Sequence, residues 1–215
     1  MLLSRLTEQT YGHYASARTM ESVGRDGEPL PWYTYPAIQW LSQLRFDGIN
    51  VLEFGSGNST RWWASKAASV LAIEDDPVWH AKIAPALPAN VEYRLVRGGP
   101  AEYSAVATGR TYGVVVIDGS HRYDCARAAI GAVEEGGMVL LDNSDWHPDT
   151  AGLLRGAGLT QVDFIGPGPI NPYSWATSTV LGPGNMRIPR AREVSVIGGV
   201  AQRSASDRPS ERLQQ

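Results

Sequence analysis

The chain has 215 residues, of which 43% are hydrophobic and 19% charged, and its net charge is -3. A chain of this size and composition folds as a globular domain with a sizeable core, and its mild acidity gives no reason to expect nucleic acid or a membrane as a partner. The single cysteine, Cys125, excludes an internal disulfide, and no apolar run is long enough to span a bilayer. Because the N-terminus lacks the pattern of a signal peptide, we expect a cytoplasmic protein.

Short apolar runs alternate with helix-compatible segments along most of the chain. Residues 1–30 are polar and mixed, which predicts irregular structure or a short helix. Apolar, β-branched runs then predict strands at 49–54, 70–74, 91–96, 112–118 and 138–141. Between them, capping residues and helical spacing predict helices that begin near 35, 59 and 76 and helices that cover 101–107, 123–135 and 148–156.

The end of this pattern differs, because two further strands, 159–165 and 177–181, follow with no helix between them. Sequential strands joined by a Gly- and Pro-rich connection suit an antiparallel pair at a sheet edge. The predicted fold class is therefore α/β, a Rossmann-like three-layer sandwich whose mostly parallel seven-stranded sheet ends in a C-terminal antiparallel hairpin. We place this domain at 31–190, and the polar composition that follows predicts a flexible tail at 191–215.

One stretch, Glu53 to Thr60 (EFGSGNST), joins the first predicted strand to the helix after it. Gly55 and Gly57 let the backbone adopt conformations closed to other residues and approach a ligand closely. A strand, a glycine turn and a helix in this order are typical of nucleotide-binding sheets, although a tight turn without a ligand has the same pattern. The acid that closes the second strand, Glu74, is placed to bind ribose hydroxyls or else to cap the next helix.

The residues around the turn distinguish between two kinds of nucleotide ligand. A dinucleotide site expects a third glycine where this chain has Thr60. A carboxylate such as Glu53 repels a pyrophosphate but suits a ligand that carries an amino group and a sulfonium. The pattern therefore favours S-adenosylmethionine over NAD. An NAD(P)-dependent oxidoreductase on the same fold and a non-catalytic nucleotide-binding protein are the alternatives.

The turn resembles motif I of the class I S-adenosylmethionine-dependent methyltransferases, and Glu74 and Asp118 match their ribose-binding acid and their fourth-strand motif. This resemblance covers about Pro31 to Leu181. In Pro31 to Pro36 and Asp142 to Trp146 the chain further resembles poorly characterised bacterial small-molecule O-methyltransferases, which implies methyl transfer to a hydroxyl of a sugar or natural product. The resemblance also implies that the cofactor is bound by Glu53, Gly55, Gly57, Asn58, Ser59, Thr60, Glu74 and Asp118.

Asp118, Asp142 and Asn143 follow the ends of two predicted strands and so share one rim of the sheet. Three oxygen donors there suit Mg²⁺, and they are similar to the metal site of the cation-dependent O-methyltransferases. The other interpretation is that they orient loops or bind the cofactor's amino group. His121 is the candidate general base, with Asp118 between cofactor and acceptor, and a capping or solvated histidine is the alternative.

Two aromatic clusters are candidates for the walls of an acceptor site. Trp32, Tyr33 and Tyr35 precede the first predicted helix of the domain and either line a cleft or pack the helix entry. Tyr173 and Trp175 belong to the connection between the last two strands, where substrate walls are built in folds of this kind. The sequence leaves open which small molecule is the acceptor and whether the protein is a homo-oligomer.

Overall fold

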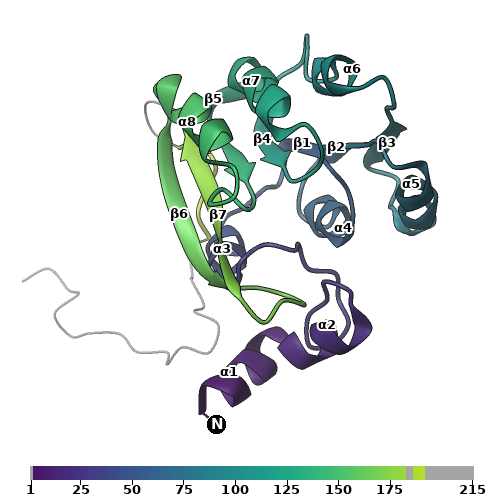
Figure 1. The fold of residues 1–215 in the computed structure, drawn as a ribbon, viewed down its shortest axis with the longest axis vertical. Helices are drawn as coiled ribbons and strands as arrows, with labels where there is room; N and C mark the ends of the chain where they lie inside the picture. The colour runs from purple at the N-terminus through teal and green to yellow at the C-terminus, as the bar shows by residue number, and fades with distance from the viewer. Residues whose placement is uncertain (1, 183–185, 192–215) are drawn as a thin grey trace, which may run out of the picture.

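The computed structural model describes residues 2–182 and 186–191. It contains a seven-stranded sheet in the order β3-β2-β1-β4-β5-β7-β6, which confirms the predicted α/β fold (Figure 1). The parallel strands are β1 (Asn50–Phe54), β2 (Ser69–Glu74), β3 (Val91–Leu95), β4 (Tyr112–Ile117) and β5 (Val133–Leu141). The expected antiparallel hairpin consists of β6 (Thr160–Pro167) and β7 (Ser174–Leu181), and β7 pairs with β5. The tail predicted at 191–215 lies outside the described residues, apart from Ala191.

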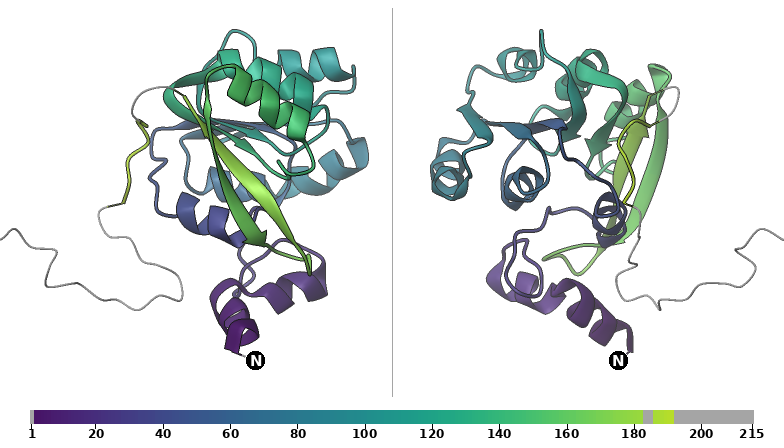
Figure 2. Two further views of the ribbon diagram at one scale, coloured as in Figure 1. Left: turned by 60° about the vertical axis from the view of Figure 1, so that its left-hand side comes forward. Right: turned by 180° about the vertical axis from the view of Figure 1, so that it is seen from behind.

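Helices cover both faces of the sheet and give the three predicted layers (Figures 1 and 2). One face carries α6 (Pro100–Ala105), α7 (Arg122–Ala132) and α8 (Pro148–Gly156). The other carries α3 (Tyr35–Leu41), α4 (Asn58–Ala64), α5 (Pro77–Ile83) and the short 3-10 helix η1 (Ala84–Ala86). Two helix starts follow predicted capping residues, since Thr34 accepts from Ala37 N before α3 and Asp76 accepts from two backbone amides before α5. The helix expected to begin near 59 starts at Asn58, directly after Gly57.

The alternation of side chains along β1 divides the core into two parts. Leu52 and Phe54 pack toward α7, and Val51 packs toward α3 and α4. Glu53 therefore points to the α4 side of the sheet, because successive side chains of a strand alternate between faces. Every residue of the central strand β4 is buried, as expected for a parallel strand with helices on both faces.

The N-terminal region, for which irregular structure or a short helix is expected, is mostly helical. It contains two helices, α1 (Leu2–Tyr11) and α2 (His13–Thr19), which lie at one end of the molecule beyond α3 (Figures 1 and 2). Tyr11 stacks on Tyr35 with ring centroids 4.1 Å apart, and its hydroxyl donates to Gln39. These contacts to α3 hold the segment in place, and they come from residues far apart in the sequence.

The helix predicted over 123–135 ends at Ala132, and the next residues extend β5 instead. Val133 pairs with Tyr112, and the register between β4 and β5 shifts before the pair Val114 and Met138. Gly137 permits the close approach of the strands, since a Cβ there would lie 2.6 Å from Gly113 O. Gly136 and Gly137, which directly follow the predicted helix, therefore belong to an irregular stretch of strand.

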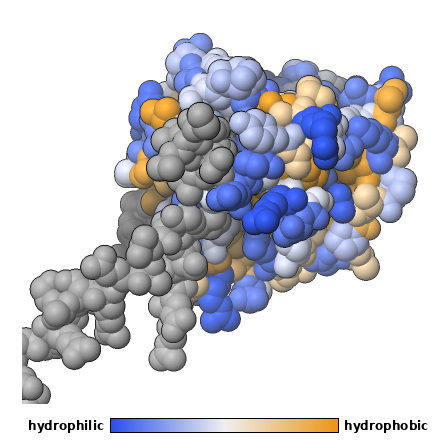
Figure 3. Space-filling model, turned by 90° about the horizontal axis from the view of Figure 1, so that it is seen from below, coloured by the Kyte–Doolittle hydropathy of each residue, from blue (hydrophilic) through white to orange (hydrophobic). Residues whose placement is uncertain are grey.

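None of the helices within residues 2–182 and 186–191 is long and apolar enough to cross a membrane. The face seen from below in Figure 3 has hydrophilic residues interspersed with hydrophobic ones. This face belongs to the end of the molecule that carries α1 and α2 in Figure 1.

Candidate functional site

A cavity of about 630 Å³ lies at the carboxyl ends of the parallel strands, where ligands of such sheets bind. Its walls include the glycine turn after β1, the end of β2 and the loops after β4 and β5. The three residues directly after α2, Met20 to Ser22, and the connection between β6 and β7 complete its walls. The cavity is therefore the candidate site, and it has room for a nucleoside and a second small molecule.

The glycine turn needs glycine at both predicted positions. Gly55 has a φ of 106°, and a Cβ on it would lie 2.9 Å from Gly119 N in the turn after β4. Gly57 has a φ of 157° with a ψ of -143° and stands directly before α4. These conformations favour glycine, and the backbone at Gly55 and Gly57 therefore borders the cavity directly, as does Gly119 in the turn after β4.

Glu53 and Thr60 lie behind this turn and do not line the cavity. Both are fully buried, and the Thr60 hydroxyl donates to Glu53 Oε2 at 2.6 Å while it accepts from Gly57 N at 3.0 Å. Burial raises the pKa of Glu53 to about 8, against the lowering effect of the Ser59 and Thr60 hydroxyls. The two residues support the turn from inside, whereas the other residues of the predicted cofactor set line the cavity, namely Gly55, Gly57, Asn58, Ser59, Glu74 and Asp118.

Glu74 performs a capping role and also faces the cavity. Its Oε1 accepts from Asp75 N at 3.0 Å and Asp76 N at 3.1 Å, and its Oε2 accepts from the Ser56 hydroxyl at 2.6 Å. The helix α5 itself is capped by Asp76, whose Oδ1 accepts from Val78 N and Trp79 N. Glu74 is thus held rigidly at the end of β2, in the position predicted for a ribose-binding acid.

The expected Mg²⁺ site contains an arginine instead. Arg122 reaches across the ends of β4 and β5 from the first turn of α7. Its guanidinium donates to Asp118 Oδ1 and Asn143 Oδ1, both at 3.2 Å, and to the carbonyl oxygen of Asp142. Its other hydrogen bonds go to the carbonyl oxygens of Gly119 and Asp118.

This arrangement does not fit a divalent cation. A guanidinium presents five N–H donors, and here two of them take the Asp118 and Asn143 side-chain oxygens while the others bind backbone carbonyl oxygens of the same rim. Within the described part of the chain, no group of three His, Cys, Asp or Glu side chains is placed to hold a metal. The internal arginine supplies the positive charge that balances the rim, so Asp118, Asp142 and Asn143 come together as predicted but around a different cation.

The two carboxyl groups of this rim differ in what they bind. Asp142 Oδ1 accepts from Trp175 Nε1 at 3.1 Å and from the Thr177 hydroxyl, and no hydrogen bond within the described residues involves its Oδ2. Burial and the neighbouring Asp118 carboxylate raise the pKa of Asp142 well above its usual range. Burial also raises the pKa of Asp118 to about 6, although Arg122 opposes that change.

His121 lies near the cavity but faces away from it. Its backbone is left-handed, with a φ of 54°, and its Nε2 is 3.7 Å from Asp75 Oδ2. The ring meets Tyr103 edge-on at a centroid distance of 5.6 Å. His121 lines an adjoining surface hollow that also contains His147, so the structure does not bring the predicted base to the cavity.

Aromatic side chains form the end of the cavity farthest from Glu74. Trp32, Trp146, Tyr173 and Trp175 line it, and Tyr173 has ring centroids 6.2 Å from Trp146 and 5.9 Å from Trp175. Of the predicted clusters, Trp32, Tyr173 and Trp175 line the cavity. Tyr33 and Tyr35 pack the buried entry to α3.

Three contributors to the cavity were missed from the sequence. Arg122 follows Asp118 by four residues, but Asp118 precedes α7, so the pairing rule for charges on one helix does not predict their contact. Trp79 donates from Nε1 to Ser56 O at 2.9 Å, and Ser22 accepts at its carbonyl oxygen from Asn58 Nδ2 at 2.8 Å. Neither contact has a local signal, since both depend on how distant segments pack.

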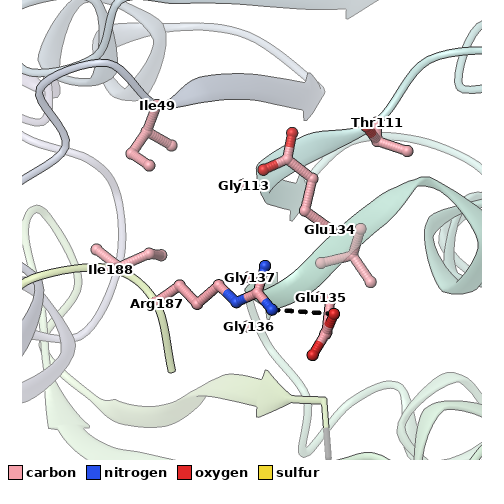
Figure 4. A pocket seen from close by; sticks show the side chains of 10 residues that line it. Ile49, Thr111, Gly113, Glu134, Glu135, Gly136, Gly137, Arg187 and Ile188 are labelled. Atoms are coloured by element: carbon pink, nitrogen blue, oxygen red, sulfur yellow. Dashed lines mark ion pairs between the residues drawn. The ribbon is translucent and has the colours of Figure 1, made fainter. Parts of the chain in front are cut away.

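Another hollow, of about 380 Å³, lies at the opposite end of the parallel strands, beside the starts of β1, β4 and β5 (Figure 4). Glu134, Glu135 and Arg187 are among the residues that line it, and Arg187 pairs with Glu135 at 3.0 Å. Both partners are mostly exposed, so water screens the pair. Parallel sheets bind ligands at the carboxyl ends of their strands and not at the amino ends. The charged side chains of this hollow are glutamate and arginine, which the cavity also contains, so the hollow is not the candidate site.

Comparisons with known proteins bear on the fold. No protein-family model matches the chain, and no curated protein matches its sequence. Among solved structures, precorrin-6y C5,15-methyltransferase from Geobacter metallireducens matches with a TM-score of 0.52 at 15% identity, over 68% of this chain and 88% of that chain. The N-methyltransferase NodS from Bradyrhizobium japonicum, in complex with S-adenosyl-L-homocysteine, matches with 0.52 at 13% identity, over 79% and 99%. A methyltransferase from Pyrococcus furiosus matches with 0.50 at 18% identity, over 69% and 84%.

These matches extend over most of each solved chain. At such low identities the likeness establishes the architecture, which is that of the class I S-adenosylmethionine-dependent methyltransferases. Two of the solved proteins are named for different methyl-transfer reactions, one a C5,15- and the other an N-methyltransferase, so the fold leaves the acceptor open.

Proposed function

We propose that the protein is an S-adenosylmethionine-dependent methyltransferase that methylates a hydroxyl of a small molecule, such as a sugar or a natural product, in the cytoplasm and without a divalent cation. The observation that carries this proposal is the composition of the cavity. Its one end combines the turn at Gly55 and Gly57 with the fixed carboxylate of Glu74, and its other end combines a buried carboxyl group with aromatic walls.

Each half of the cavity has a separate task in this mechanism. When it is bound, S-adenosylmethionine supplies an electrophilic methyl group on a sulfonium. Glu74 accepts hydrogen bonds from the ribose hydroxyls, and the turn at Gly55 and Gly57 gives the amino-acid part close access to the backbone. The aromatic walls orient the acceptor, and such alignment lowers the barrier by about 7–11 kcal/mol.

Proton removal falls to Asp142 in this proposal, in place of the predicted His121. Asp142 lines the cavity and His121 does not. Asp142 is 3% exposed, and Trp175 and Thr177 hold its Oδ1, which leaves Oδ2 as the acceptor for a hydroxyl proton in this proposal. A carboxyl group with a raised pKa is a stronger base than an ordinary carboxylate, which suits a hydroxyl of high pKa.

Calorimetry with S-adenosyl-L-homocysteine and with NADH tests the proposed cofactor. We expect the wild type to bind S-adenosyl-L-homocysteine and not NADH, and Glu74→Ala to weaken that binding by about 10- to 100-fold because the ribose loses its acceptor. Glu92→Ala, which changes an exposed acid of β3 that pairs with Arg94, is the matched control and leaves binding intact. Binding of NADH alone would favour the oxidoreductase, and binding of neither would end the proposal.

Chelation is expected to leave turnover unchanged, because the Arg122 guanidinium already binds the Asp118 and Asn143 side-chain oxygens of the predicted metal site. The measurement is S-adenosyl-L-homocysteine formation with a panel of phenols and sugars, before and after dialysis against EDTA, and with Mg²⁺ added back. A loss of turnover that Mg²⁺ restores would contradict this prediction and return the metal to the rim.

A further inference from the structure

One corner of the cavity contains a buried hydroxyl group without a hydrogen bond. Ser22, just after α2, is 7% exposed and lines the cavity beside the glycine turn. Its Oγ is buried and makes no hydrogen bond to any residue that the structure describes. Buried hydroxyls are nearly always paired, so one that is unpaired at the wall of a cavity indicates a ligand atom as its partner.

A guanidinium with unused donors lies in the same corner. Arg61 of α4 lines the cavity, and its Nη1 donates to Asn58 Oδ1 at 3.1 Å. No other hydrogen bond or ion pair joins its guanidinium to residues 2–182 or 186–191. The remaining N–H groups are free for a ligand, and a guanidinium binds a carboxylate with two parallel hydrogen bonds.

The side-chain amide of Asn58 forms hydrogen bonds with both residues, Ser22 and Arg61. Its Nδ2 donates to the Ser22 carbonyl oxygen at 2.8 Å, and its Oδ1 accepts from Arg61. Asn58 directly follows Gly57, so this arrangement is built onto the end of the glycine turn. The ligand atom that Ser22 and Arg61 share must therefore lie close to the turn and not at the aromatic end.

We propose that Ser22 and Arg61 bind the carboxylate of the amino-acid part of the cofactor, and that Asn58 is their positioning residue. The inference rests on the proposed function, which puts that amino-acid part over the glycine turn. A hydroxyl donor and a guanidinium together recognise a carboxylate, which accepts from both. Glu21 also lines the cavity, but its side chain is exposed, so water screens its repulsion of the ligand. The segment after α2 is then part of the cofactor site.

Two ligands that differ only in the amino-acid part test this assignment. S-adenosyl-L-homocysteine has the carboxylate, whereas 5′-methylthioadenosine has the same nucleoside and sulfur without it. By calorimetry, Ser22→Ala and Arg61→Gln should each weaken S-adenosyl-L-homocysteine by about 10- to 100-fold, the effect of one hydrogen bond to a charged group, and leave 5′-methylthioadenosine unchanged. Asn58→Ala should show the same split. Arg45→Gln, at an exposed arginine paired with Asp47, is the control and changes neither affinity.

Thermal unfolding of the ligand-free protein gives an independent readout. Ser22→Ala removes a hydroxyl that has no partner, so its melting temperature should equal or exceed that of the wild type while its affinity falls. Unchanged S-adenosyl-L-homocysteine affinity in both variants overturns the inference and leaves the proposed function intact. Equal losses for the two ligands also overturn it, because the carboxylate is then not what the residues recognise. If the wild type binds 5′-methylthioadenosine but not S-adenosyl-L-homocysteine, both proposals fall.

Discussion

Asp142→Asn is expected to lower turnover by about 10²- to 10⁴-fold, the usual effect of removing a general base, and to leave cofactor affinity nearly unchanged. The asparagine side-chain oxygen can still accept the hydrogen bonds that Trp175 Nε1 and the Thr177 hydroxyl donate to Oδ1. The substitution therefore removes the basic oxygen and preserves the packing. The measurement is the rate of S-adenosyl-L-homocysteine formation under saturating cofactor.

The pH profile gives the same prediction a second test. Asp142 accepts a proton only when it is ionised, and burial together with Asp118 raises its pKa well above the ordinary value for aspartate. Turnover should therefore rise with pH as Asp142 loses its proton, and Asp142→Asn should lose that rise. His121→Gln is the matched comparison, because His121 lies outside the cavity. A large loss in His121→Gln with little loss in Asp142→Asn would restore the histidine as the base.

Arg122→Met is expected to destabilise the fold by about 3–5 kcal/mol, the usual effect of removing one partner of a buried ion pair. The Arg122 side chain is 14% exposed, and without it the Asp118 carboxylate and three backbone carbonyl groups lose their donors. Methionine keeps an unbranched apolar stem and removes the guanidinium with its charge and donors. Urea unfolding measures the difference in the free energy of unfolding.

A second arginine on the same helix provides the control. Arg127 pairs with Asp124 at 3.3 Å, but its side chain is 65% exposed. Arg127→Met should therefore change the free energy of unfolding by less than about 1 kcal/mol. Similar small effects in both variants would show that Arg122 is not the internal cation of the rim.

The fold was predictable because its signals are local. The run from Val114 to Ile117 indicates a strand buried on both faces, and the glycines at 55 and 57 mark a turn that other residues cannot form. The N-terminal helices and the end of α7 were not predictable in this way. Their boundaries depend on the stacking of Tyr11 on Tyr35 and on a register shift between β4 and β5.

The site was predictable in position but not in its contacts. Strand ends place Asp118 and Asp142 on one rim, but they do not say which cation reaches them, and Arg122 does so from the next helix. His121 is close to Asp118 in sequence, yet its left-handed backbone directs the ring to Asp75. Ser22 reaches the turn through a contact between residues 36 positions apart, which no local pattern contains.

The β6–β7 connection has a consequence for redesign. Its residues Ile170 and Tyr173 wall the cavity, while the hairpin ladder is already complete at Pro167 and Ser174. The length of this connection can therefore be changed without moving the register of the strands that carry the glycine turn and Glu74. Under the proposed function, we expect loops of other lengths between these two residues to change the acceptor range and to leave the cofactor half of the cavity unaltered.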